Sequence, residues 1–77
     1  MTKKDFYRLI DEIIEADPGT IKGGEQLADL PAWDSLAVVG FIASMDKNLG
    51  ASVSAAQLIE AKSVEDLLRL VVDRISG

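Results

Sequence analysis

The chain contains no cysteine and no histidine among its 77 residues. Without cysteine it can form no disulfide, and without either residue it lacks the usual ligands of a structural zinc site. The lack of histidine also removes the commonest general base, so a Ser-His-Asp or Cys-His nucleophile cannot be assembled from this chain. No D-x-[DN]-x-[DN]-G loop for calcium occurs either. These absences argue against an enzyme, and any thiol chemistry has to come from an attached group.

Positive charge is scarce, because eight Lys and Arg stand against thirteen Asp and Glu, for a formal net charge of −5. This balance disfavours binding to nucleic acid or to anionic membranes and favours protein partners with basic surfaces. Residues 1–8 interrupt their apolar positions with charges and so lack a signal-peptide pattern, and no apolar run approaches the roughly 20 residues of a membrane span. We expect a monomeric cytoplasmic protein with one domain over residues 1–77.

Helical spacing of apolar residues predicts helices near both ends of the chain. The first begins with a capping-box pattern at Thr2 and Asp5 and ends at Asp17–Pro18. Its core stripe is Phe6, Leu9, Ile10, Ile13 and Ile14, and its expected outer side is Asp11, Glu12 and Glu15. The last helix begins at Ser63, and its core stripe is Val64, Leu67, Leu68, Val71, Val72 and Ile75. Ahead of it, the Ser54–Gln57 capping box predicts a short helix through about Glu60.

The middle of the chain predicts a long ordered loop over residues 18–34, with Trp33 as an anchor, followed by a second helix. This helix should begin at Asp34 or Ser35 and end at about Asn48, with Gly50 after it. One stripe suits the core: Phe41, Ile42, Met45 and Leu49. A second stripe is Leu36, Val39 and Ala43, so the helix is either central or exposes one apolar face to a partner. Gly40 indicates the close approach of another helix.

Together these signals predict an all-α fold: a four-helix bundle with a long loop between the first two helices and a short third helix. The proposed central core is Ile10, Ile13, Phe41, Ile42, Leu68 and Val71.

The tripeptide Asp34-Ser35-Leu36 lies where the long loop meets the second helix. In one interpretation it is only a helix start, in which Asp34 caps the backbone. In the other, the outward hydroxyl of Ser35 is a modification site, because a phosphodiester there would lie in the favourable field of a helix N-terminus. With no histidine to activate it, the serine would be a substrate for another enzyme.

The whole chain resembles the acyl carrier proteins in size, acidity, helix order and long first loop. Trp33-Asp34-Ser35-Leu36 is similar to the W-D-S-L motif of freestanding carriers, and residues 61–67 resemble the segment that leads into their last helix. The resemblance implies an acyl-carrier-like fold in which Ser35 bears 4′-phosphopantetheine from coenzyme A, and the thiol of that arm holds acyl groups as thioesters. It also implies that Asp34 caps the helix and helps present the serine to a Mg²⁺-dependent phosphopantetheinyl transferase. Further implied partners are an acyl- or aminoacyl-loading ligase and downstream acyl-processing enzymes.

The second helix departs from the carriers of fatty acid synthesis, which line it with acidic residues. Here Asp46 is the one acidic residue in the helix body, so we expect partners to dock on the apolar face of Leu36, Val39 and Ala43 beside Asp46. Such a carrier would serve a fatty-acid-like, polyketide or other specialised pathway, although neutral variation explains the lost charge equally well. Two alternatives stay open: an aminoacyl or peptidyl carrier, whose G-G-x-S-L motif residues 32–36 do not match, and an unmodified helical interaction module.

Overall fold

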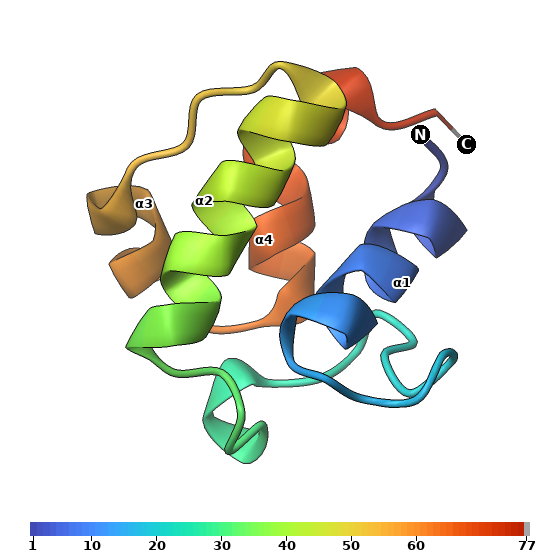
Figure 1. Cartoon of the computed structure of the whole chain (residues 1–77), viewed down its shortest axis with the longest axis vertical. Coiled ribbons are helices and arrows are strands. Elements are labelled where there is room, and N and C mark those ends of the chain that lie inside the picture. The colour runs from blue at the N-terminus through green and yellow to red at the C-terminus, as the bar shows by residue number, and fades with distance from the viewer. Residues whose placement is uncertain (77) are drawn as a thin grey trace.

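Four α-helices make up most of the computed structural model, which describes residues 1–76 (Figure 1). They are α1 (Lys3–Ile13), α2 (Ser35–Leu49), α3 (Ala55–Glu60) and α4 (Val64–Leu70). A 3-10 turn, η1 (Leu27–Asp29), lies within the long loop, and a second, η2 (Val72–Arg74), follows α4. Among residues 1–76 the only β-pairings are two isolated bridges, Thr2 with Ser76 and Gln26 with Ser63. The predicted all-α fold, with its long first loop and short third helix, is confirmed.

The core forms between α1, α2 and α4. Phe6 and Ile10 of α1, Phe41 and Met45 of α2, and Val64 and Leu67 of α4 are all completely buried. The rings of Phe6 and Phe41 meet edge to face with centroids 6.0 Å apart, and Trp33 packs on Phe41 in the same way at 5.9 Å. Such edge-to-face pairs add to the stability that burial provides. Trp33 is therefore the loop anchor that the sequence predicted, and it ties the residues just before α2 to the core.

Side chains cap the helices largely as their sequences predict. Thr2 with Asp5 and Ser54 with Gln57 form reciprocal capping boxes at α1 and α3. Asp34 and Ser63 cap α2 and α4 through their side-chain oxygens. Gly50 follows α2 with a φ of +62°, the left-handed conformation that glycine adopts at little cost.

The end of α1 differs from the sequence prediction, because the helix stops at Ile13, before Asp17–Pro18. The amide of Ala16 donates to the carbonyl of Asp11 at 2.8 Å and the amide of Glu15 to that of Glu12 at 3.2 Å. This pair of bonds is a Schellman motif, which satisfies the last carbonyls of a helix. Its left-handed position is held by Glu15, with a φ of +57°, where glycine is usual. The chain thus turns away before proline can end the helix.

Asp11 is buried, with 1% of its surface exposed, although the sequence placed it on the outer side of the first helix. Its carboxylate accepts hydrogen bonds from the amides of Gly19 at 2.9 Å and Ile21 at 2.8 Å. Those amides belong to the loop, which folds back over α1 and covers the aspartate. The buried carboxylate is satisfied by this contact and holds the first half of the loop in place.

The second half of the loop is fixed against the start of α4. The amide of Leu27 donates to the carbonyl of Lys62 at 2.9 Å, and the amide of Val64 donates to that of Glu25 at 3.0 Å. Between the two anchors lies Gly23, with a φ of +110°, where an added Cβ would come within 2.5 Å of the Tyr7 hydroxyl. Both the backbone conformation and the close contact with Tyr7 require glycine at position 23. Together with the two sets of hydrogen bonds, this gives the long loop one defined path toward α2.

The last helix is shorter than predicted, because α4 ends at Leu70 and η2 follows. Val71 leaves helical geometry with a φ of −127°, which breaks the spacing that would have turned Val72 inward. Val72 is therefore 52% exposed, and its predicted place in the core stripe is wrong. Of the predicted central core, Ile10, Phe41, Leu68 and Val71 are buried, whereas Ile13 and Ile42 are only partly buried against the cluster.

Candidate functional site

At the start of α2, the adjacent residues Asp34 and Ser35 have different roles. Asp34 has extended backbone angles and is the N-cap, with its Oδ1 accepting a hydrogen bond from the amide of Ala37 at 3.0 Å. Its carbonyl accepts the first helical bond, from Val38, also at 3.0 Å. Ser35 is thus the first helical residue, and it is exposed. Because Asp34 does the capping, the hydroxyl of Ser35 is left available to react with something outside the chain.

Two backbone amides at this helix start have no acceptor. Among residues 1–76, the N–H groups of Ser35 and Leu36 donate to no protein atom, whereas that of Ala37 is bonded to Asp34. Unsatisfied amides and the positive end of the helix dipole favour an anion at this position. A phosphodiester formed on the Ser35 hydroxyl would lie beside both donors, so the residues present fit such a group.

An open cavity of about 170 Å³ adjoins Ser35. It lies between the end of α1 and the first turn of α2, and Asp34 and Leu36, the two chain neighbours of Ser35, both border it. Its complete lining is Ile13, Ile14, Glu15, Ala32, Asp34, Leu36 and Ala37. The sequence analysis missed this cavity, because the Ile13–Glu15 segment was expected to continue a straight helix.

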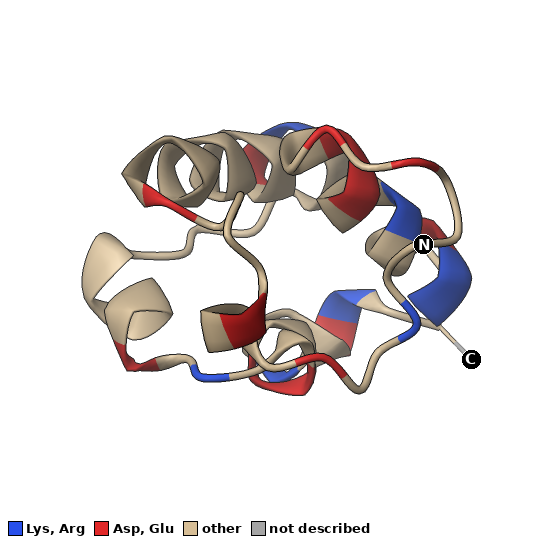
Figure 2. Cartoon of the chain, turned by 90° about the horizontal axis from the view of Figure 1, so that it is seen from below, with Lys and Arg blue, Asp and Glu red and all other residues tan. Residues whose placement is uncertain are grey.

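The apolar face of α2 that the sequence singled out is exposed. Leu36 is 77% exposed and Val39 is 62% exposed, and Ala43 and Asp46 are exposed on the following turns. Asp46 and Lys47 are the only charged residues of α2, and most red and blue residues in Figure 2 lie elsewhere on the chain. On the adjacent α3, Ile59 is 78% exposed. Sequence reasoning missed Ile59, since one apolar residue in a short helix carries no periodicity.

Gly40 lies on α2 where α1 approaches closely. A Cβ built at this glycine would be 3.6 Å from Cγ2 of Ile13. This is an ordinary van der Waals distance, so the contact with α1 does not by itself require glycine, and the predicted reason for Gly40 stays a prediction.

The rest of residues 1–76 offers little competing chemistry. Within that range no cluster of three or more Asp and Glu side chains is arranged to hold a metal ion. None of the helices described is long and apolar enough to cross a membrane. The other serines with a helix-start position, Ser54 and Ser63, use their hydroxyls as caps. The free helix-start hydroxyl of Ser35 is the distinctive reactive feature.

Comparison with known proteins gives a family match. A family model described as a phosphopantetheine attachment site matches residues 5–71, from the first turn of α1 to the end of α4. No curated protein and no solved structure matches the chain.

Proposed function

The chain belongs to the phosphopantetheine-attachment family, and on that premise we propose that Ser35 is the residue that bears the arm. Domains of this family are attachment sites for 4′-phosphopantetheine, and they act as carriers and not as enzymes. The observation that carries the assignment to Ser35 is its place beside the capping residue Asp34, with an exposed hydroxyl and two free amides next to it.

The chain's own residues prepare the serine but do not activate it. Asp34 fixes the start of α2 and thereby the direction of the Ser35 hydroxyl, while the amides of Ser35 and Leu36 would hold the negative phosphodiester. Deprotonation of the hydroxyl has to be performed by the partner transferase with its Mg²⁺, since the chain has no histidine and the Asp34 carboxylate is already engaged in the cap. When bound, the arm supplies a terminal thiol that can hold a carboxylic acid as a thioester.

The attachment is tested by intact mass. Incubation with coenzyme A, Mg²⁺ and a broad-specificity phosphopantetheinyl transferase should add one phosphopantetheine to the wild-type chain. Ser35→Ala should add none, and the matched variant Ser63→Ala, which removes a capping serine, should be modified like wild type. Full modification of Ser35→Ala would refute the assignment, and an unmodified wild-type chain beside a modified control carrier would favour the interaction-module alternative.

We assign the cargo to the acyl class, in a fatty-acid-like, polyketide or other specialised biosynthetic pathway. The support is the W-D-S-L form of Trp33-Asp34-Ser35-Leu36, together with Ala32 and Trp33, which stand where the G-G-x-S-L pattern of peptidyl carriers has its two glycines. An aminoacyl cargo is the second candidate, and assays of the loading ligase with fatty acids and amino acids discriminate between the two. The monomeric state and the cytoplasmic location stay predictions.

The exposed face of Leu36, Val39 and Ala43 is the proposed docking surface for the transferase, the loading ligase and the downstream enzymes, with Asp46 at its edge. Burial of such apolar side chains against a partner stabilises a complex with little dependence on salt, since few charges are there to be screened. A steep fall of the loading rate with ionic strength would show instead that charges outside α2 govern docking.

Val39→Asp should reduce loading by the cognate ligase at least tenfold, because a carboxylate would be desolvated in the interface. Val72→Asp is the matched control, since Val72 is 52% exposed on η2, away from this face, and should leave loading unchanged. Both variants should keep the wild-type fold by circular dichroism. Equal loss of loading in the two variants would contradict the assignment of the face.

A further inference from the structure

The cavity beside Ser35 is placed so that a group attached to this serine reaches it first. It is bordered by Asp34 and Leu36, immediately before and after Ser35, and on its other side by Ile13–Glu15 at the end of α1. Its volume of about 170 Å³ suits a small branched group and is too small for a whole prosthetic arm with cargo. We therefore expect the cavity to hold the part of the attached group that lies closest to Ser35.

The lining of the cavity selects the chemistry of that occupant. Ile13, Ile14 and Ala37 give it an aliphatic floor, while the rim carries the acidic side chains of Glu15 and Asp34. Two acidic residues at the rim disfavour a phosphate inside the cavity, so the phosphodiester belongs outside, on the free amides of Ser35 and Leu36. A neutral segment with a branched alkyl group and hydroxyl or amide donors matches both the floor and the rim.

Glu15 has an unusual conformation for a cavity-lining residue. It occupies the left-handed position of the Schellman motif with a φ of +57°, which L-residues with a side chain adopt at a cost that glycine avoids. Here the strain turns the chain at the end of α1 so that Ile13, Ile14 and Glu15 all border the cavity.

We propose that this cavity seats the pantoyl segment of the arm, with its two geminal methyl groups on Ile13 and Ile14 and its hydroxyl donating to the carboxylate of Glu15. This segment directly follows the phosphate, only a few bonds from the serine oxygen, and is the one part of the arm that combines a branched alkyl group with a hydroxyl donor. The inference rests on the proposed function, because it needs the arm on Ser35. The root of the arm is then held against the bundle, and only the later amide-linked part with the thiol extends to the partner enzymes.

Nuclear magnetic resonance of the holo protein tests the proposal without any partner activity. The wild-type chain is labelled at its isoleucine methyl groups, modified on Ser35 and left with a free thiol. We expect nuclear Overhauser effects between the pantoyl methyl protons and the methyl groups of Ile13 and Ile14. The same isoleucine signals should shift between the apo and holo forms, whereas that of Ile59 on α3 should not.

A pair of alanine variants supplies the control. Ala32 is exposed and lines the cavity, so Ala32→Leu should fill part of it and weaken the pantoyl contacts severalfold. Ala28 is exposed in η1 and lies outside the cavity, so Ala28→Leu should leave the contacts at their wild-type strength. If Ala32→Leu fails to fold, the wild-type contacts decide alone.

The outcomes separate this inference from the assignment of Ser35. A chain that gains no phosphopantetheine by mass refutes both. A chain modified on Ser35 whose pantoyl methyl groups contact neither Ile13 nor Ile14, or contact Ile59 instead, overturns the cavity proposal and leaves the carrier function standing. Equal weakening in Ala32→Leu and Ala28→Leu would also overturn it.

Discussion

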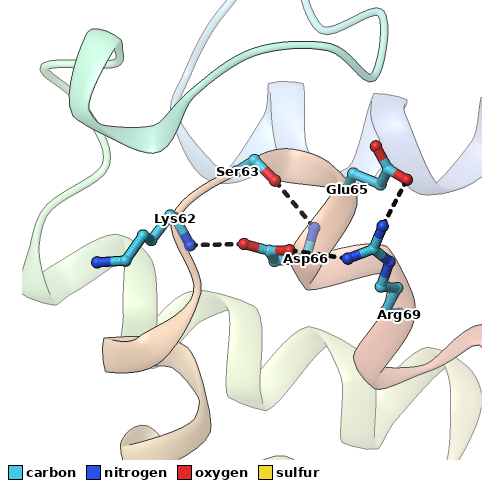
Figure 3. Close-up of polar contacts among 5 residues, drawn as sticks. All are labelled: Lys62, Ser63, Glu65, Asp66 and Arg69. Carbon is cyan, nitrogen blue, oxygen red and sulfur yellow. Dashed lines mark hydrogen bonds and ion pairs between the residues drawn. The ribbon is translucent and has the colours of Figure 1, made fainter.

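The starts of α2 and α4 look alike in sequence but differ in how far their polar groups are satisfied. At α4, Ser63 caps the helix, with its hydroxyl accepting from the amide of Asp66 at 3.2 Å, and Asp66 in turn accepts from the amide of Lys62 at 2.9 Å (Figure 3). Arg69 joins Asp66 at 3.3 Å and Glu65 at 2.9 Å on the outer side. At α2, Asp34 makes one cap bond and the next two amides stay free.

The comparison shows that a shift of one residue relative to the N-cap decides whether a serine hydroxyl is used by the helix or is free. Ser63 is the N-cap, so its hydroxyl is occupied by the helix it begins. Ser35 follows the N-cap, so its hydroxyl and the adjacent amides are free for an external group. At α4 the amide of Val64 donates to the carbonyl of Glu25, so that within residues 1–76 only the Glu65 amide lacks an acceptor before Asp66. At α2 both amides that follow the cap lack one in the same part of the chain, and such donors can receive a ligand.

Exchanging Asp34 and Ser35 is the most severe test of whether position relative to the N-cap decides the role of the serine. In the double variant Asp34→Ser/Ser35→Asp the relocated serine becomes the cap, and both new residues suit their helix positions, so unfolding free energy should change by less than about 1 kcal/mol. Phosphopantetheine addition should nevertheless fall below detection by intact mass. Modification of the relocated serine at a rate near that of wild type would show that cap and attachment roles are compatible after all.

Removing the cap at each helix start should separate stability from modification. Ser63→Ala and Asp34→Ala should each lower the free energy of unfolding by about 1 kcal/mol, because each leaves an amide without its acceptor. Only Asp34→Ala should also slow the transferase, since it loosens the turn that carries Ser35. Urea unfolding and the initial rate of modification measure the two effects, and equal rates for the two variants would contradict a local role for Asp34.

Lowering the pH should reduce the contribution of the Asp66 carboxylate at the start of α4 to the stability of the fold. The hydrogen bond from the Lys62 amide is the main cause that lowers the pKa of Asp66 below 3.8, and Arg69 and Ser63 act in the same direction. A lowered folded-state pKa means that the contribution to stability is present above 3.8 and is lost as the pH falls through the folded value. The small stability advantage of wild type over Asp66→Asn should therefore shrink in urea titrations as the pH is lowered from neutral to below 3.8. A constant difference at all pH values would exclude this linkage.

What the sequence predicts well is local. The caps at Thr2, Asp34, Ser54 and Ser63 depend on side chains and amides three residues apart, so they can be predicted from the local sequence. The place of Ser35 directly after the cap follows from the same local pattern. The exposure of Leu36 and Val39 also follows from helical spacing, because the second helix has one apolar stripe more than its core needs.

What the sequence does not predict depends on segments that meet in space. Asp11 looks like an outer residue until the loop returns to it with Gly19 and Ile21. The cavity needs Glu15 to leave the helix and Ala32 to approach from the loop, and neither event has a periodic signal. The prediction for Val72 fails for the opposite reason. Its spacing is that of a continuing helix, but α4 ends at Leu70 and Val71 no longer has helical backbone angles.

The two ends of the chain lie side by side, far from the start of α2 (Figure 1). The amide of Ser76 donates to the carbonyl of Met1 at 2.8 Å, and Thr2 pairs with Ser76 in a β-bridge. A short linker could therefore join them into a closed chain without straining this end of the bundle. An affinity handle or a fused enzyme placed at either end would likewise leave the Ser35 side unobstructed, which makes the domain suitable for surface immobilisation with the proposed attachment serine facing outward.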